Sequence, residues 1–281
     1  MLRSTLFTVK EEEKATREGF GEGLVNAGTN DDRIVALCAD LTDSVKMDGF
    51  RAKFQDRFFE VGITEQAMSG LASGMAAMGY IPFMASYAMF SPGRNWEQIR
   101  TTICLNDRPV KIVGSHAGVS VGPDGATHQM LEDIALMRSL PNMQVIVPCD
   151  SVQAAKATEL LAKSTKPAYI RLAREATPIV TSPDTPFALG RAEVYREGSD
   201  VTIAACGAMV YEALAAAQKL AAEGIEAEVI NVAVIKPLDV SAIVASVRKT
   251  GAIVTAEEAQ VAGGLGGAIA EALSVQQPTP L

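Results

Sequence analysis

The chain has 281 residues, of which 48% are hydrophobic and 21% charged, and its formal net charge is −8. This length suffices for two ordinary α/β domains, and the composition is typical of a globular protein with a sizeable core. The acidic balance and the lack of a Lys/Arg cluster exclude a nucleic-acid or anionic-membrane surface, because such surfaces need a basic stripe.

The sequence carries no targeting signal that we can identify. Residues 1–14 lack the charged segment and apolar run of a signal peptide, and no apolar stretch reaches the roughly 18 residues of a membrane-spanning helix. The cysteines Cys38, Cys104, Cys149 and Cys206 lie far apart and form no CxxC pair, so we expect buried, reduced thiols. We therefore predict a cytoplasmic protein, and no metal ligands in this chain.

Runs of β-branched apolar residues alternate with helical patterns along the chain. Strands are predicted at 33–38, 110–113, 145–147 and 168–171, and helices at 14–27, 65–78, 95–105 and 151–161. Short strands separated by helices of this length predict crossover connections and a parallel sheet that is covered on both faces.

Residues 176–190 break this alternation, since they contain three prolines and turn formers without helical periodicity. We read them as a linker between two α/β domains, at 1–175 and 191–281. Strands are predicted again at 201–206, 228–232 and 252–255, with helices at 210–222 and 240–248, and Gly224 is expected to end the first helix. A glycine run at 263–267 does not match the GxGxxG fingerprint and indicates tight packing between a strand and a last helix.

The segment 60–79 (EVGITEQAMSGLASGMAAMG) predicts a buried strand that runs into a helix, with Glu65 in the first helical turn. The field of the helix N-terminus stabilises a carboxylate there, which is a sufficient structural reason for Glu65. Gly70 and Gly74 lie one turn apart and predict a smooth helix face that another element can approach closely.

Val61-Gly62-Ile63-Thr64-Glu65-Gln66 resembles the segment of transketolases that carries the cofactor-activating glutamate. The likeness continues in the family's order over most of residues 14–180, through YIPF at 80–83, Tyr87, Phe90, GSHAGVSVGPDGATHQ at 114–129, PCD at 148–150 and 170–174. The resemblance implies two doubly wound domains, a pyrimidine-binding domain followed by a transketolase C-terminal domain. It also implies transfer of a two-carbon ketol unit from a ketose phosphate to an aldose, with thiamine diphosphate as cofactor.

The resemblance assigns cofactor roles to four residues. Glu65 would hydrogen-bond the aminopyrimidine and favour its imino tautomer, which removes the thiazolium proton. For that bond Glu65 must hold or share a proton, which an apolar setting favours; we expect Ile63, Met68 and Leu71 to supply it. Tyr87 and Phe90 match the family's aromatic pair, with Phe90 stacked on the ring, and Asp40 matches a residue near both rings. Gly93 stands where many members have a third aromatic residue.

Substrate roles follow from the same likeness. His128 resembles the histidine that contacts substrate hydroxyls and assists proton transfer, and Asp124 resembles the residue that reads a donor hydroxyl. The implied ligands of the donor phosphate are His116, Arg174, Arg17 and Ser44. An arginine fork suits a tetrahedral oxyanion. A sulfonate is a similar oxyanion, so a sulfosugar donor is an alternative.

The Gly-Asp-Gly motif and downstream Asn that hold the diphosphate through a divalent cation in this family are not found. The resemblance therefore implies a partner, the transketolase N-terminal section, that holds Mg²⁺ and the diphosphate in an α2β2 assembly. The sequence also ends before the last strand and helix usual for such C-terminal domains, which suggests truncation. Alternatives are half of a 2-oxoacid dehydrogenase or of a deoxyxylulose-phosphate synthase, and a non-catalytic partner. The run 124–128 with His116 favours transketolase over the dehydrogenase half, and intact Glu65, Phe90, His128 and Arg174 argue against a non-catalytic partner.

Overall fold

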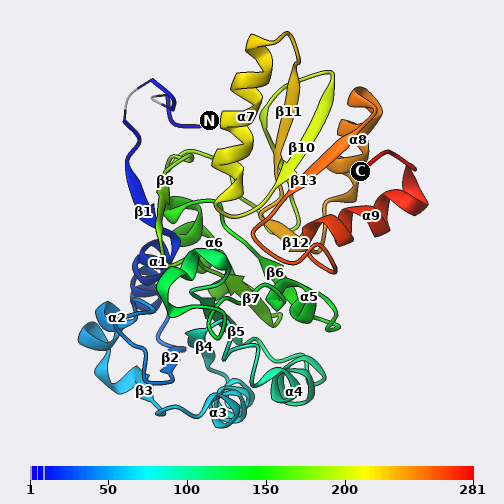
Figure 1. Ribbon diagram of the computed structural model, residues 1–281. Helices are drawn as coiled ribbons and strands as arrows, with labels where there is room; N and C mark the ends of the chain where they lie inside the picture. The colour runs from blue at the N-terminus through cyan, green and yellow to red at the C-terminus, as the bar shows by residue number, and fades with distance from the viewer. Residues whose placement is uncertain (1, 5, 9) are drawn as a thin grey trace.

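A seven-stranded sheet forms the centre of the first domain, in the order β12-β6-β7-β5-β4-β2-β3 (Figure 1). Its strands are β2 (Ile34–Cys38), β3 (Phe58–Glu60), β4 (Ile81–Tyr87), β5 (Lys111–Ser115), β6 (Gln144–Ile146), β7 (Ala168–Arg171) and β12 (Val234–Lys236). All neighbours are parallel except β12, which runs antiparallel to β6. This computed structural model describes residues 2–4, 6–8 and 10–281, and its parallel sheets confirm the predicted fold class.

Helices cover both faces of this sheet because its strands bury side chains on both sides. In β2, Val35 and Leu37 belong to one core cluster, whereas Ile34 and Ala36 belong to another. The first cluster includes residues of α3 (Glu65–Ala77), the π-helix η2 (Ile99–Cys104) and α5 (Asp133–Arg138), and the second includes residues of α1 (Thr16–Asn30), α2 (Asp48–Lys53) and α6 (Ser151–Lys163). The short α4 (Trp96–Gln98) leads directly into η2.

The second domain carries a four-stranded sheet in the order β13-β10-β11-β9. Its elements are β9 (Glu193–Arg196), β10 (Val201–Ala205), α7 (Met209–Ala222), β11 (Ala227–Asn231), α8 (Val240–Thr250), β13 (Ile253–Ala256) and α9 (Leu265–Gln276). Gly224 follows α7 with φ +81°, which confirms the predicted helix stop. A Cβ at Gly264 would lie 2.2 Å from the Glu257 carboxylate, so the predicted tight packing before α9 is confirmed.

Residues 176–190, which the sequence predicts as a linker, are fixed to the first domain. They begin with β8 (Ala176–Pro178), which pairs antiparallel with β1 (Glu13–Ala15). The buried Asp150 carboxylate then accepts hydrogen bonds from the backbone N–H groups of Val180 (2.9 Å) and Thr181 (2.6 Å). The sequence missed β8 because it spans three residues and has only one pairing partner.

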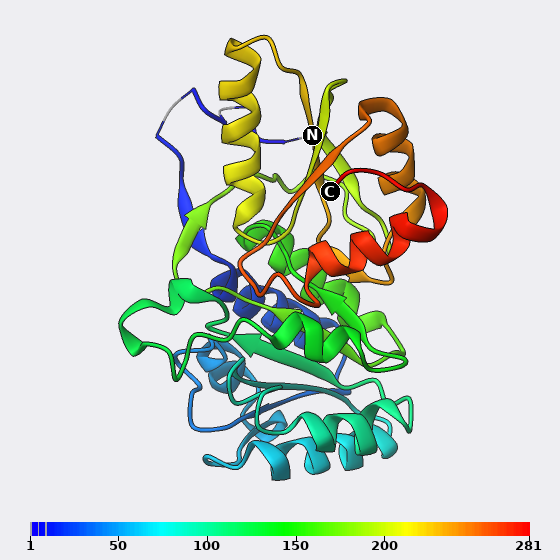
Figure 2. The same cartoon turned by 45° about the vertical axis from the view of Figure 1, so that its right-hand side comes forward.

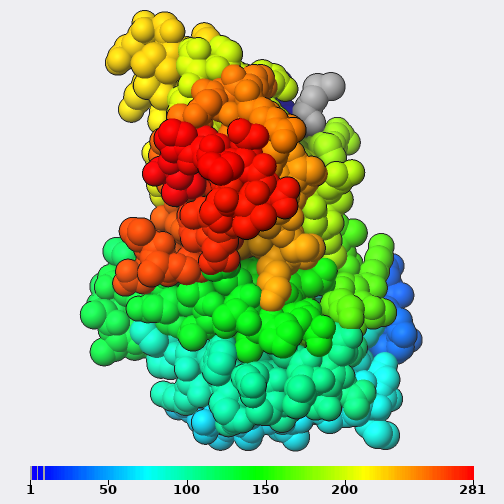
Figure 3. Space-filling model, turned by 90° about the vertical axis from the view of Figure 1, so that its right-hand side faces the viewer, coloured from blue at the N-terminus to red at the C-terminus, as the bar shows by residue number. Residues whose placement is uncertain are grey.

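The two domains also share structure directly. The chain returns from β11 to add β12 to the edge of the first sheet, and Lys236 donates to the carbonyls of Arg138 (2.9 Å) and Leu140. Figure 2 shows β13 coming down toward the first domain, and Figure 3 shows the orange and red C-terminal residues resting on its green residues. Across the described residues, no helix is long and apolar enough to span a membrane.

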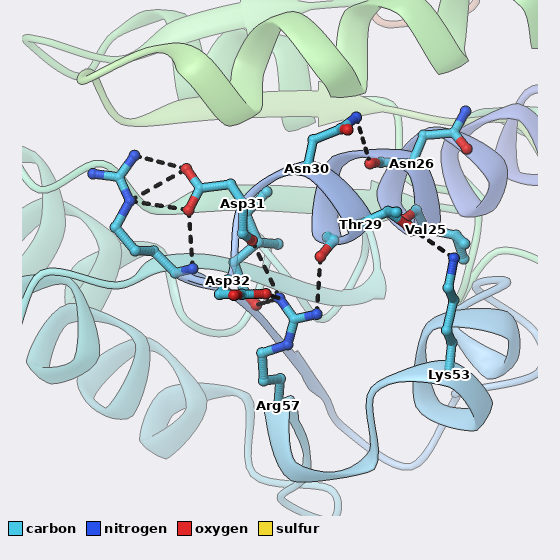
Figure 4. Close-up of polar contacts among 11 residues, drawn as sticks. Val25, Asn26, Thr29, Asn30, Asp31, Asp32, Lys53 and Arg57 are labelled. Carbon is cyan, nitrogen blue, oxygen red and sulfur yellow. Dashed lines mark hydrogen bonds and ion pairs between the residues drawn. The ribbon is translucent and has the colours of Figure 1, made fainter.

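Arg57, in the 3-10 turn η1 (Gln55–Arg57), secures the end of α1 beside the sheet (Figure 4). Its guanidinium donates to the carbonyls of Gly28 (2.8 Å) and Asp31 (3.1 Å), while Lys53 donates to Thr29 Oγ1 (2.9 Å). The last turn of α1 has no basic residue of its own, so these side chains meet its carbonyl end. They thereby fix the turn that leads into β2.

Candidate active site

The residues proposed for the site follow the carboxyl ends of adjacent parallel strands. Asp40 follows β2, Glu65 follows β3, Tyr87 ends β4 and precedes Phe90, His116 follows β5 ahead of Asp124 and His128, and Arg174 follows β7. Parallel strands end at the same edge of a sheet, and ligands of open α/β sheets bind there. The fold therefore brings side chains from five separate segments to one edge.

Glu65 is the first residue of α3, and only 1% of it is exposed. Arg94 Nη1 donates to its Oε2 at 3.0 Å, and Asn95 Nδ2 donates to its backbone carbonyl at 3.1 Å. From the described residues, its Oε1 accepts only a long hydrogen bond, 3.5 Å from Ser86 Oγ. The carboxylate is thus held in place through one oxygen while the other has spare acceptor capacity.

The surroundings of Glu65 differ from the apolar setting that the sequence predicts. Met68 is fully buried, but Ile63 and Leu71 are 69% and 48% exposed, and β3 is an exposed edge strand. The neighbour of the carboxylate is instead the cation of Arg94. Of the three residues expected to surround Glu65, Met68 is therefore buried as expected, whereas the expectation for Ile63 and Leu71 was wrong because they lie at the surface of this chain.

Arg94 is a site residue that the sequence reasoning missed. Its guanidinium carbon lies 5.1 Å from the centroid of the Phe90 ring, so one side chain contacts both Glu65 and Phe90. The signal was the position of Arg94 in the same aromatic segment, four residues after Phe90. A buried carboxylate requires a partner, and that requirement points to the nearest arginine.

Aromatic contacts join the two histidines to the predicted aromatic pair. The rings of Tyr87 and Phe90 have centroids 6.2 Å apart, and the His116 ring stacks on Tyr87 at 3.9 Å. The His128 ring meets Phe90 edge-on at 5.3 Å. Tyr87, Phe90, His116 and His128 therefore form one cluster, which separate motifs in the sequence do not reveal.

His116 is buried in a strained backbone conformation. It is 2% exposed and has φ +58°, and its Nδ1 lies 2.9 Å from Ser115 Oγ. Burial, together with the nearby charges of Arg17, Arg174 and His128, lowers the pKa of His116 to about 3. Asp40 also has positive φ, +59°. Non-glycine residues with such backbones concentrate at functional sites.

The proposed anion ligands are also close together. Arg17 donates through Nε to the Arg174 carbonyl (3.1 Å) and through Nη1 to the Ser44 carbonyl (2.7 Å). Arg174 Nη1 lies 3.7 Å from Asp124 Oδ1 and donates to the Val121 carbonyl at 2.6 Å. Arg17 thus fixes the backbone of two other proposed ligands.

Asp124 and His128 lie on the segment that contains the 3-10 helix η3 (Val119–Asp124). The His128 backbone N–H donates to the Gly125 carbonyl at 2.9 Å, and its Nδ1 lies 2.9 Å from Thr127 Oγ1. The Asp40 backbone N–H donates to Glu60 Oε1 at 2.6 Å. Asp40 lies at the same edge of the sheet, and this hydrogen bond joins it to the last residue of β3.

The site fits one end of the implied cofactor better than the other. A buried carboxylate with an under-used oxygen, beside an aromatic ring, suits a nitrogen heterocycle that donates a hydrogen bond. A divalent cation would need several oxygen ligands. In the part of the chain that the structure describes, no group of three or more His, Cys, Asp or Glu residues is arranged to hold a metal ion.

Comparison with known families agrees with this site. Residues 12–180 match the family described as "Transketolase, pyrimidine binding domain", and residues 190–279 match "Transketolase, C-terminal domain". The chain therefore belongs to the transketolase family.

Its relatives place it among split members of that family. It is 44% identical to "6-deoxy-6-sulfo-D-fructose transketolase subunit SqwH" of Clostridium sp. (strain MSTE9), over 98% of this chain and 85% of the relative. It is 41% identical to "Putative transketolase C-terminal section" of Methanocaldococcus jannaschii, over 93% and 82%. A solved structure described as "Split gene transketolase, inactive beta4 tetramer" matches with a TM-score of 0.90 and 48% identity, over 96% of this chain and 88% of that one.

Burial of a neutral His116 predicts a specific loss of stability in acid. The unfolded state takes up a proton below a pKa of about 6.5, whereas the folded state does so only near 3. The stabilisation is complete above pH 6.5 and is lost as the pH falls toward 3. Relative to His116→Gln, the free energy of unfolding of the wild type should fall by about 1.4 kcal/mol from pH 7.5 to 5.5. Urea unfolding at both pH values measures this difference, and a constant difference would contradict it.

Proposed function

We propose that this chain is the C-terminal subunit of a split transketolase that is active only with its diphosphate-binding partner. In that role it transfers a two-carbon ketol unit from a ketose phosphate to an aldose. When bound, thiamine diphosphate supplies the nucleophilic carbon for this transfer. The chain contributes the groups that bind the pyrimidine end of the cofactor and the donor sugar.

The observation that carries this proposal is the bonding of Glu65. Arg94 holds Oε2, which leaves Oε1 to accept a hydrogen bond from, or share a proton with, an aminopyrimidine nitrogen. Phe90 contacts the same arginine that holds this carboxylate, and it offers a ring face for stacking. A carboxylate that only stabilised the N-terminus of α3 would not need an aromatic ring such as Phe90 nearby.

The exposed face of α3 supports association with another subunit. Leu71 on this helix is exposed, as are Ile63 just before it and Met78 just after it, and a Cβ at Gly70 or Gly74 would meet no atom within 4 Å. A partner packed on this face would bury apolar side chains and exclude water from the neighbourhood of Glu65. We propose the transketolase N-terminal section as this partner, in an α2β2 assembly, holding Mg²⁺ and the diphosphate.

We assign the donor sugar to the residues around Arg174 and the two histidines. Arg174, with His116 and Ser44 nearby, would bind its anionic group, while Asp124 and His128 would contact its hydroxyls. His128 would also exchange a proton with the reacting hydroxyl. A neutral His116 offers the anion a hydrogen bond rather than a charge, so the arginine supplies the positive charge.

A sulfosugar donor is the second candidate, favoured by the 44% identity to a subunit named for 6-deoxy-6-sulfo-D-fructose. A sulfonate and a phosphate present similar oxygen atoms to an arginine fork. They differ in charge, because a sulfonate carries one negative charge and a phosphate monoester up to two. The donor preference of the assembled enzyme decides between them.

Replacing Glu65 by Gln in the assembled enzyme should slow hydrogen–deuterium exchange at the thiazolium C2 carbon by about 10²–10⁴-fold, because a positioned acid–base group is lost. The change is nearly isosteric, so assembly should persist. Glu97→Gln, which alters an exposed carboxylate bonded to Gln98, is the matched control. Exchange at the wild-type rate in Glu65→Gln would reduce Glu65 to a helix-terminus carboxylate.

Replacing Arg174 by Ala should raise KM for a phosphorylated ketose by about 10- to 100-fold, because charge-assisted hydrogen bonds to the anion are lost. The effect on hydroxypyruvate should be slight, since that donor lacks the anionic end. Steady-state kinetics with both donors gives the contrast. Equal losses on the two would mean that Arg174 acts through the Val121 carbonyl and has a structural role.

A further inference from the structure

The C-terminal domain contacts the segment that carries Asp124 and His128. Glu258 lies between β13 and α9, and its Oε1 accepts a hydrogen bond from the Ser120 backbone N–H at 2.6 Å. Its Oε2 lies 3.2 Å from Ser120 Oγ, which donates to it. One carboxylate of the second domain therefore binds both donors of a residue at the start of η3.

Other residues near this contact also accommodate Glu258 and its neighbours. Gly118 has φ +89°, and a Cβ there would lie 2.4 Å from the Glu258 carboxyl carbon, so only glycine leaves room for it. The Glu258 carbonyl accepts from Arg171 Nη2 at 2.7 Å, and the Gln260 N–H donates to the Leu131 carbonyl at 2.9 Å. The turn after β13, which Figure 2 shows approaching the first domain, is thus fixed on both sides of η3.

Beyond the buried Val121, the segment turns at two glycines and is more exposed. Gly122 and Gly125 have φ +74° and +76°, and a Cβ at either would meet no atom within 4 Å. Residues 122–125 therefore lie open, with backbone conformations that glycine adopts without strain. Glu258 on Ser120 and Arg174 on the Val121 carbonyl anchor the first residues of the segment. Gln129 Nε2 also donates to the Val119 carbonyl at 3.3 Å. Without the bond between Glu258 and Ser120, we expect residues 122–128 to move relative to Arg174.

We propose that Glu258 is a positioning residue for donor binding. Through Ser120, the C-terminal domain sets the placement of Asp124 and His128 against Arg174. The proposal rests on the proposed function, because it assumes that these side chains contact the donor. It gives the C-terminal domain a part in substrate binding through its contact with η3.

Glu257 provides a matched control in the adjacent position. Its two oxygens accept hydrogen bonds from the backbone N–H groups of Leu265 (2.7 Å) and Gly266 (2.9 Å), at the start of α9. Its removal weakens the C-terminal domain without touching η3. A general loss of domain stability would affect both variants, whereas loss of positioning should affect Glu258 alone.

The first measurement is amide hydrogen exchange over residues 119–128 in the enzyme assembled with its diphosphate-binding partner. Glu258→Ala should speed this exchange about tenfold or more, because a local anchor is removed. Glu258→Gln should have a smaller effect, because its amide oxygen can still accept from the Ser120 N–H. Glu257→Ala should leave the segment unchanged. No acceleration in Glu258→Ala, or equal acceleration in Glu257→Ala, would overturn the proposal.

The second measurement is the KM for fructose 6-phosphate. Glu258→Ala should raise it about tenfold, with hydrogen–deuterium exchange at the thiazolium C2 carbon at the wild-type rate, because Glu65 is untouched. Faster amide exchange with an unchanged KM would also overturn the proposal, because the contact between Glu258 and Ser120 would then contribute to stability but not to donor binding. A wild type that turns over neither a phosphorylated nor a sulfonated ketose would refute the proposed function instead, and the amide exchange, which needs no substrate, would still test the anchor.

Discussion

The common carboxyl edge of the parallel strands is the constraint on which the site depends. β2, β3, β4, β5 and β7 all end there, and each is followed by at least one proposed site residue. Sequence distance therefore counts for little: Arg17 bonds to the carbonyl of Arg174, 157 positions away. The buried faces of the strands fix the register of the sheet, and the register fixes which loop residues meet.

Some polar residues at this edge adopt backbone conformations or a burial that cost free energy. Asp40 and His116 adopt positive φ, and His116 is buried neutral beside two arginines. The surrounding structure must supply the energy for this arrangement, which it does through the aromatic cluster and the bonds of Arg17. The second domain takes part as well, by adding β12 to the sheet and placing Glu258 on Ser120.

Much of this fold is predictable from the sequence because periodicity reports burial. The run at 33–38 is apolar on both faces and forms β2, and Gly224 ends α7 as its backbone freedom allows. Strands of three residues are hard to predict: the apolar run at 145–147 indicated β6, whereas β8 and β12 were missed. The sequence motif around Glu65 indicates the family of the chain, but it does not indicate that Glu65 pairs with Arg94. That pairing, like Glu258 on Ser120, depends on tertiary placement that local pattern does not encode.

The central claim is that this chain holds only the pyrimidine half of a cofactor site, and cofactor affinity tests it most directly. Titration calorimetry with thiamine diphosphate and Mg²⁺ compares the purified chain alone with the chain mixed with its diphosphate-binding partner. The account predicts weak binding by the chain alone and tight, Mg²⁺-dependent binding by the mixture. Tight, Mg²⁺-dependent binding by the isolated chain would contradict it, because the diphosphate and its cation would then be held by residues of this chain.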